Sequence, residues 1–179
     1  MLKIYKDSSI YLRTRSAEVP LPLSKSDHKL LLNMLEHLKQ SQDPEFAEKH
    51  KLREGVGLAA PQVGINKRMI AIYYHKDEQV IQYGLVNPKI IASSIKQCAL
   101  QNGEGCLSVD NPHEGLVYRA HKITVKAFDM LQDKEITIVA YDYDAIVIQH
   151  EIDHLNGVLF YDRIDAKNPF NKKENAVII

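Results

Sequence analysis

The segment His150-Glu151-Ile152-Asp153-His154 constrains the fold of this chain more than any other stretch. On a helix, residues four apart share one face, so both histidines can reach a single metal ion while Glu151 stands beside it. The apolar run 145–148 precedes the motif, and Gly157 follows it as a helix cap. We therefore expect a buried helix whose histidines face inward and hold a metal that activates water. The alternative is a packed helix with two satisfied core histidines.

The length and the charge balance of the chain limit the classes of protein to which it can belong. With 179 residues, it suits one domain spanning 1–179 that can bury a sizeable core. Its 23 Lys and Arg balance its 23 Asp and Glu without a long run of either sign, so no nucleic-acid partner is indicated. The first residues lack a signal-peptide core, and no stretch approaches the roughly 20 apolar residues of a membrane span. We expect a cytoplasmic protein without membrane contact.

Hydrophobic periodicity predicts one amphipathic helix and several strands. Within 21–40, Leu31, Met34, Leu35 and Leu38 recur at helical spacing, after Ser24 and Ser26 as candidate caps. The expected strands are 67–74, 82–91 with a bend at Pro88, and a hairpin of 122–128 with 136–138. Strands grouped before a single late helix favour an α+β fold, with mostly antiparallel sheets packed around the buried HExxH helix.

A catalytic metal with two histidine ligands needs a third, because open sites usually have three protein ligands. An extended motif with a third histidine would place it where this chain has Phe160. Glu174 has a suitable separation but lies in a short polar C-terminal segment. Cys106 is the best candidate, since flanking glycines allow close approach and its thiolate binds zinc or iron strongly. Cys98 lies in an apolar context and is expected in the core.

Three segments, in order along the chain, resemble the motifs of the peptide deformylases. They are Gly-Val-Gly-Leu-Ala-Ala-Pro-Gln at 55–62, Glu-Gly-Cys-Leu-Ser at 104–108 and Gln-His-Glu-Ile-Asp-His at 149–154. A polar insertion around 41–53 and the length of 109–119 resemble the second class of that family, typical of Gram-positive bacteria. The resemblance implies a metal-dependent hydrolase that removes the formyl group from the N-terminal formyl-methionine of new polypeptides and releases formate.

The resemblance also implies a role for each site residue. The implied metal ligands are Cys106, His150 and His154. Glu151 would carry protons, while the Gln62 side-chain amide and the Leu107 backbone N–H would stabilise charge on the formyl oxygen. The implied substrate-binding residues are Val56, Gly57, Gly105, Tyr143, Ile146 and Val147. Read without the resemblance, Gln62 is a loop-stabilising amide, and Val56, Ile146 and Val147 are ordinary core residues.

The ligand set does not select its metal. A thiolate and two imidazoles accept zinc, iron, cobalt or nickel. The resemblance implies Fe2+ as the physiological ion, with Zn2+, Ni2+ or Co2+ able to substitute, and N-formylmethionyl nascent peptides as partners. We expect a monomer. Nothing in the sequence supports ribosome contact, because relatives that dock there use a longer C-terminal helix.

Other charged residues near the motifs have supporting roles in this interpretation. Asp153 is expected to orient its surroundings through a nearby cation, with Arg119 as the candidate. Glu104 is expected to support a ligand or to form an ion pair in its loop. Neither carboxylate is expected to bind the metal.

Two rival functions are open on the residues alone. A zinc endopeptidase also uses HExxH, but the missing histidine at Phe160 and the candidate thiolate ligand argue against it. A structural metal module would need a fourth ligand such as Cys98, His113 or His121. A formylated peptide distinguishes these readings, because only a deformylase releases formate from it.

Overall fold

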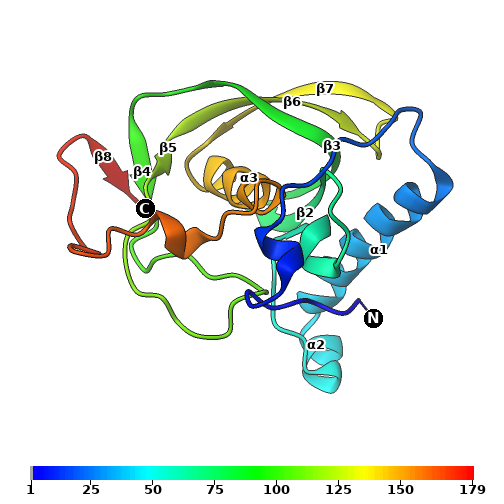
Figure 1. Ribbon diagram of the computed structural model, residues 1–179, viewed down its shortest axis with the longest axis horizontal. Helices are drawn as coiled ribbons and strands as arrows, with labels where there is room; N and C mark the ends of the chain where they lie inside the picture. Colours follow the sequence, from blue (N-terminus) through cyan, green and yellow to red (C-terminus); the bar gives the residue numbers. More distant parts are fainter. Residues whose placement is uncertain (1) are drawn as a thin grey trace.

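The computed structural model describes residues 2–179. Its elements are η1 (Ile10–Arg13), α1 (Lys25–Ser41), α2 (Pro44–His50), β1 (Gly57–Ala59), η2 (Ala60–Val63), β2 (Met69–Lys76), β3 (Gln79–Ser93), β4 (Gln97–Ala99), β5 (Arg119–Ala120), β6 (Lys122–Asp129), β7 (Lys134–Tyr141), α3 (Asp142–Leu155), η3 (Phe160–Arg163) and β8 (Ala176–Ile178). An antiparallel five-stranded sheet has the order β1-β2-β3-β6-β7, and a smaller sheet has the order β5-β4-β8. Helix α3 lies at the centre, under the curved large sheet (Figure 1). The predicted α+β architecture is confirmed.

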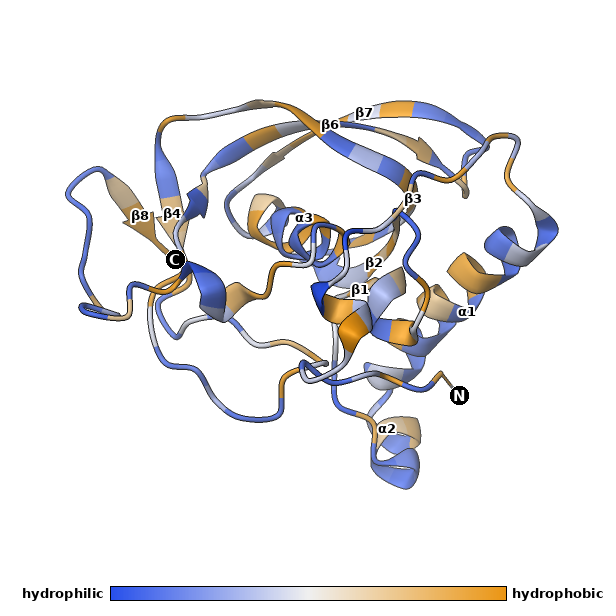
Figure 2. Cartoon of the chain, viewed as in Figure 1, coloured by the Kyte–Doolittle hydropathy of each residue, from blue (hydrophilic) through white to orange (hydrophobic). Residues whose placement is uncertain are grey.

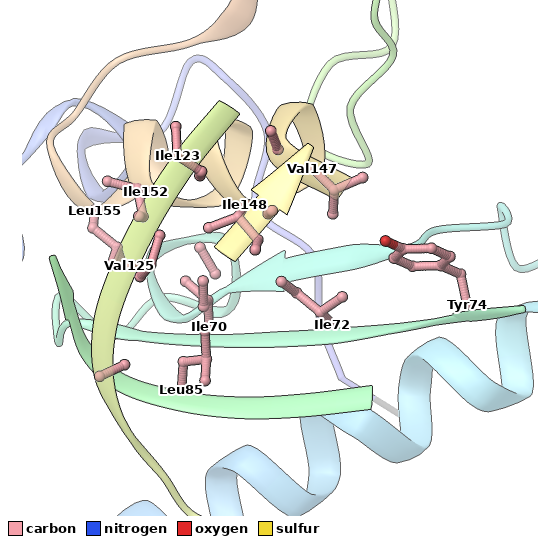
Figure 3. Close-up of a cluster of buried hydrophobic side chains, with 14 residues drawn as sticks. Ile70, Ile72, Tyr74, Leu85, Ile123, Val125, Val147, Ile148, Ile152 and Leu155 are labelled. Atoms are coloured by element: carbon pink, nitrogen blue, oxygen red, sulfur yellow. The ribbon is translucent and has the colours of Figure 1, made fainter. Parts of the chain in front are cut away.

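The central helix is anchored by its apolar residues. Ile148 and Ile152 of α3 pack in one buried cluster with Ile70 and Ile72 of β2 and Ile123 of β6 (Figure 3). Fully burying one such side chain contributes about 1.5–3 kcal/mol, so these contacts fix the position of the helix. The remaining surface of α3, which carries the polar motif, is thereby held in one place.

Strand β2 is covered on both faces. Ile70 and Ile72 face α3, whereas Met69 and Ala71 belong to a second cluster formed with α1. A strand buried on both sides has no polar alternation, which explains its nearly continuous apolar sequence.

Among residues 2–179, no helix combines the length and hydrophobicity needed to cross a membrane.

Helix α1 confirms the predicted amphipathic segment. It begins at Lys25, directly after the candidate cap Ser24, whose side chain accepts a hydrogen bond from the Asp27 N–H and caps the first turn. Leu31, Met34, Leu35 and Leu38 are all buried. The helix carries hydrophobic residues on one side and hydrophilic residues on the other (Figure 2).

The predicted hairpin is formed by β6 and β7, and the bend in β3 at Pro88 appears as a shift of register between Val86 and Lys89. The polar C-terminal segment 171–175 is followed by residues for which the sequence predicts no element. They form β8, which pairs in parallel with β4 and places Val177 opposite Cys98. A three-residue strand paired with a distant partner has no periodicity that the sequence could reveal.

Candidate metal centre and active-site cleft

Helix α3 brings the two histidines of the motif together. His150 and His154 follow one another by a helical turn, and their ring centroids are 4.9 Å apart. The backbone leaves the helix at Asn156, and Gly157 has φ +75°, a left-handed conformation that glycine adopts easily. His154 is 1% exposed, so its imidazole is removed from bulk water. Burial lowers the pKa of His154 and keeps it neutral, the form that binds metals.

The third member of the cluster comes from an irregular loop. Cys106 Sγ lies 3.3 Å from His154 Nε2 and accepts a contact from the Ser108 N–H at 3.4 Å. Ligand atoms of Cys106, His150 and His154 all lie within 4.8 Å of one another, and no other such group occurs in residues 2–179. Thiolate and imidazole donors at this spacing fit a transition-metal ion.

The other candidate ligands lie elsewhere. Glu174 borders a separate surface hollow with Ile95 and Lys96. Cys98 belongs to β4, and neither His113 nor His121 joins the cluster in the described part of the chain. A structural site with four protein ligands is therefore not formed. A site with three ligands leaves one position for water or substrate.

A buried ion-pair network holds the His150 ring through Nδ1, the nitrogen that faces away from the cluster. His150 Nδ1 lies 2.8 Å from Glu104 Oε2, which leaves Nε2 for the metal centre. Arg119, whose side chain is 1% exposed, contacts Glu104 at 2.6 Å and Asp153 at 2.7 Å. Burial would raise the pKa of Glu104, but hydrogen bonds from Arg119 and His150 outweigh it and lower the pKa to about 2. The predicted pairing of Arg119 with Asp153 and the supporting position of Glu104 are both present.

Glu151 stands beside the cluster with a free oxygen. It is 4% exposed, and its Oε2 has no hydrogen-bond partner within residues 2–179. Burial raises the pKa of Glu151 to about 7. A methyl group added to Gly57 would collide with the Glu151 carboxylate, so glycine at this position makes the room that the carboxylate needs. A carboxyl group in such a position can accept and return a proton.

Gln62 points its amide nitrogen into the same region. Its Oε1 accepts a hydrogen bond from the Ala59 N–H at 2.8 Å, which fixes the orientation of the amide. Its Nε2 lies 3.1 Å from Ser108 Oγ and 3.6 Å from Cys106 Sγ. Gln62 is thus both a loop-stabilising amide and a donor beside the cluster of Cys106, His150 and His154.

An open strand edge runs along the cleft. The Tyr73 N–H donates to the Val56 carbonyl at 3.0 Å, and Gly57 is paired with Ile72. Hydrogen bonds alternate along an antiparallel pair, so the N–H and C=O of Gly57 turn away from β2. They are available to a chain that lies alongside.

The cleft has a volume of about 400 Å3. All six predicted substrate-binding residues line it: Val56, Gly57, Gly105, Tyr143, Ile146 and Val147. Gln62, Cys106, Leu107, His150 and Glu151 line it as well. Part of the apolar wall of the cleft is formed by α3. Ile146 and Val147, which could also be read from the sequence as core residues, therefore border a cavity.

Arg53 and Leu100 also line the cleft and were not predicted. Arg53 lies in a charged stretch that shows no motif, and Leu100 follows the short strand β4. Neither residue belongs to a motif or a periodic pattern that could be recognised in the sequence. Their position depends on how distant loops pack together.

Two histidines, a cysteine and a buried carboxylate, gathered in a cleft beside a free strand edge, make this protein a metal-dependent hydrolase of extended peptide-like substrates. The polypeptide deformylase family matches residues 1–170. Peptide deformylase of Oceanobacillus iheyensis is 50% identical over 177 residues, which are 98% of this chain and 96% of that protein. Peptide deformylase 2 of Bacillus subtilis is 48% identical over 180 residues, covering 100% of this chain and 97% of that protein. The chain belongs to the peptide deformylase family, which removes the N-formyl group from new polypeptides.

Solved structures agree with this assignment. A probable peptide deformylase from Synechococcus phage S-SSM7 has a TM-score of 0.75 and 35% identity, covering 92% of this chain and 100% of that chain. A class I type b peptide deformylase from Acinetobacter baumannii, bound to Met-Ala-Ser, has a TM-score of 0.72 and 30% identity, covering 92% of this chain and 98% of that chain. The sequence comparisons and the structural comparisons therefore lead to the same family and the same fold.

Proposed function

We propose that this deformylase binds its metal through Cys106, His150 and His154 and uses Glu151 as its proton carrier. The observation that supports the proposal is the convergence of these four side chains on one cleft, with Glu104 holding the outer nitrogen of His150. When bound, the metal supplies Lewis acidity that activates water near neutral pH.

The protein groups divide the remaining work. Glu151, with one free carboxylate oxygen, accepts the proton of the attacking water and delivers it to the departing amine. Negative charge that builds on the formyl oxygen is stabilised by the Gln62 Nε2 donor and by the backbone N–H of Leu107, both of which line the cleft. Donors held in position by the fold in this way would lower the cost of reorganisation during the reaction.

The substrate enters as an added strand. Its main chain pairs with the free N–H and C=O of Gly57 and runs past Gly105 on the opposite wall. The methionine side chain occupies the apolar pocket of Val56, Tyr143, Ile146 and Val147, which suits an unbranched thioether. A bound Met-Ala-Ser in the relative from Acinetobacter baumannii is consistent with a peptide of this kind.

A direct test measures formate released from formyl-Met-Ala-Ser by anaerobically purified protein. Glu151→Gln should lower kcat by at least about 100-fold, the scale of a lost general acid-base group, while it keeps its metal. Glu36→Gln, which changes an exposed carboxylate on α1, is the control and should match the parent protein. Formate release by Glu151→Gln at the parental rate would remove Glu151 from the mechanism.

We further propose ferrous iron as the physiological metal. Activity should fall during storage in air and return on anaerobic reconstitution with Fe2+, because oxidation removes the competent ion. Protein reconstituted with Zn2+ in parallel is the comparison. Equal turnover with zinc and iron under anaerobic conditions would contradict the assignment.

We also propose that a monomer is the active unit on nascent chains in the cytoplasm. All residues assigned to the metal centre and the cleft come from one chain. Sedimentation of the active protein at assay concentration tests this. A sedimenting dimer whose dissociation abolishes formate release would contradict it.

A further inference from the structure

The loop that carries Cys106 is held by two cationic side chains on its carbonyl oxygens. Arg53 Nη2 donates to the Cys106 carbonyl, and Arg53 Nη1 donates to the Val109 carbonyl at 2.9 Å. Lys6 Nζ donates to the next carbonyl, that of Leu107, at 3.1 Å. The guanidinium is planar with donors in a fixed fork, so Arg53 can hold both of its carbonyls in one geometry.

The Cys106 carbonyl and the Leu107 N–H belong to the same peptide unit. In a trans peptide the C=O and the N–H point in opposite directions across a rigid plane. The Cys106 carbonyl also accepts a hydrogen bond from the Val109 N–H at 3.1 Å, so Arg53 is the second, charged donor on this oxygen, and its contact helps to orient the N–H of the same peptide. The Leu107 N–H donates to no acceptor within residues 2–179, and Leu107 lines the cleft.

The contact from Arg53 also carries charge. A hydrogen bond from an ionised donor is shorter and about twice as strong as a neutral one. It draws electron density toward the carbonyl oxygen, and hydrogen-bonded groups polarise one another in series. The N–H at the far end of the same peptide becomes a stronger donor.

We propose that Arg53 is a positioning residue for the reaction: it orients and polarises the Cys106–Leu107 peptide so that the Leu107 N–H stabilises the charge on the formyl oxygen. This inference rests on the role proposed above for the Leu107 N–H. Arg53 acts through the peptide and does not need to touch the substrate. Its side chain is 49% exposed, so its replacement leaves the buried core intact.

Steady-state kinetics separate this role from direct substrate binding. Arg53→Ala should lower kcat about 10- to 100-fold, somewhat less than complete removal of an oxyanion donor, with KM within about twofold of the parent. Arg53→Lys keeps the positive charge but loses the planar fork, so its kcat should lie between those of Arg53→Ala and the parent. Lys6→Ala is the matched control, because it removes a cation from the same loop without touching the Cys106 carbonyl, and its kcat should stay within about threefold of the parent.

An NMR measurement reports on the peptide itself. Cys106 is followed by leucine and Cys98 by alanine, so labelling with carbonyl-13C cysteine and 15N leucine gives one doubly labelled peptide. In zinc-loaded protein, Arg53→Ala should shift the Cys106 carbonyl carbon upfield and move the Leu107 amide resonance. Lys6→Ala should leave the Cys106 carbonyl carbon in place.

The outcomes are distinct. A lower kcat at unchanged KM, together with the carbonyl shift, supports the proposal. A raised KM with parental kcat would make Arg53 a substrate contact, and an unmoved carbonyl resonance would show that Arg53 does not hold this peptide; either result overturns it. If the parent protein releases no formate, the proposed function fails instead, while the NMR measurement still tests the geometry.

Discussion

At the scale of single residues, the two cysteines show how surroundings decide chemistry. Cys98 is fully buried in β4, and burial raises its pKa to about 11. Cys106 lies in a loop that lines the cleft, next to His154 and Gln62. A reagent that enters the cleft can reach Cys106 but not Cys98, so the two side chains differ in accessibility although they belong to one chain.

This difference predicts the result of thiol labelling. Metal-free protein treated with a thiol reagent near neutral pH should take up about one equivalent at Cys106, because Cys98 is inaccessible and protonated. Loading with Zn2+ should protect Cys106. Peptide mapping by mass spectrometry checks the site, and Cys106→Ser, which should remain unlabelled, is the control. Equal modification of both cysteines in folded protein would contradict the burial of Cys98.

At the scale of elements, the Arg119 network fastens α3 to its surroundings. Arg119 in β5 contacts Glu104 in the loop before Cys106 and Asp153 on α3, and Arg163 in η3 contacts Asp153 from outside at 2.6 Å. The Arg119, Glu104 and Asp153 side chains are each at most 8% exposed. The two carboxylates depend on the cation between them, because an isolated buried charge is costly.

Removing that cation should destabilise the fold. Arg119→Met removes the buried cation that Glu104 and Asp153 share, leaving Asp153 with only the half-exposed Arg163 and Glu104 with only His150, and should lower the free energy of unfolding by about 3–5 kcal/mol. Arg163→Met, whose side chain is 43% exposed, should cost less than about 1 kcal/mol, since exposed ion pairs contribute little. Urea unfolding of both variants beside the parent measures the difference. Equal losses in the two variants would contradict the special role of the buried cation.

The sequence revealed those elements whose signal is local. The helix 21–40, the motif helix and the hairpin of β6 and β7 each carry their periodicity within a few residues. The six residues proposed to bind the substrate were predicted from the family resemblance: three of them, Val56, Gly57 and Gly105, lie within its motifs, and the others, Tyr143, Ile146 and Val147, precede the third motif on α3. By contrast, β8 pairs with a strand almost 80 residues away, and Arg53 reaches a loop about 50 residues on. Such contacts form only in the assembled fold, so no local sequence pattern predicts them.

At the scale of the whole molecule, the proposed metal centre joins parts that are distant in sequence. Cys106 belongs to the loop after β4, whereas His150 and His154 belong to α3, which the large sheet covers (Figure 1). A metal bound to all three links the loop to the core of the fold. Its ligands come together only in the folded chain, so binding free energy adds to folding free energy.

Metal removal should therefore lower the unfolding temperature of the entire chain. At a free metal concentration about 1,000 times Kd, binding contributes about 4 kcal/mol, and each kcal/mol shifts Tm by about 2–4 °C for a domain of this size. We predict that zinc-loaded protein unfolds about 8–16 °C above metal-free protein, each in one calorimetric transition, because a single domain unfolds as a unit. In Cys106→Ala the added metal should give a much smaller shift. A full shift in that variant would exclude Cys106 as a ligand, and two separate transitions in the parent would show that 1–179 is not one cooperative domain.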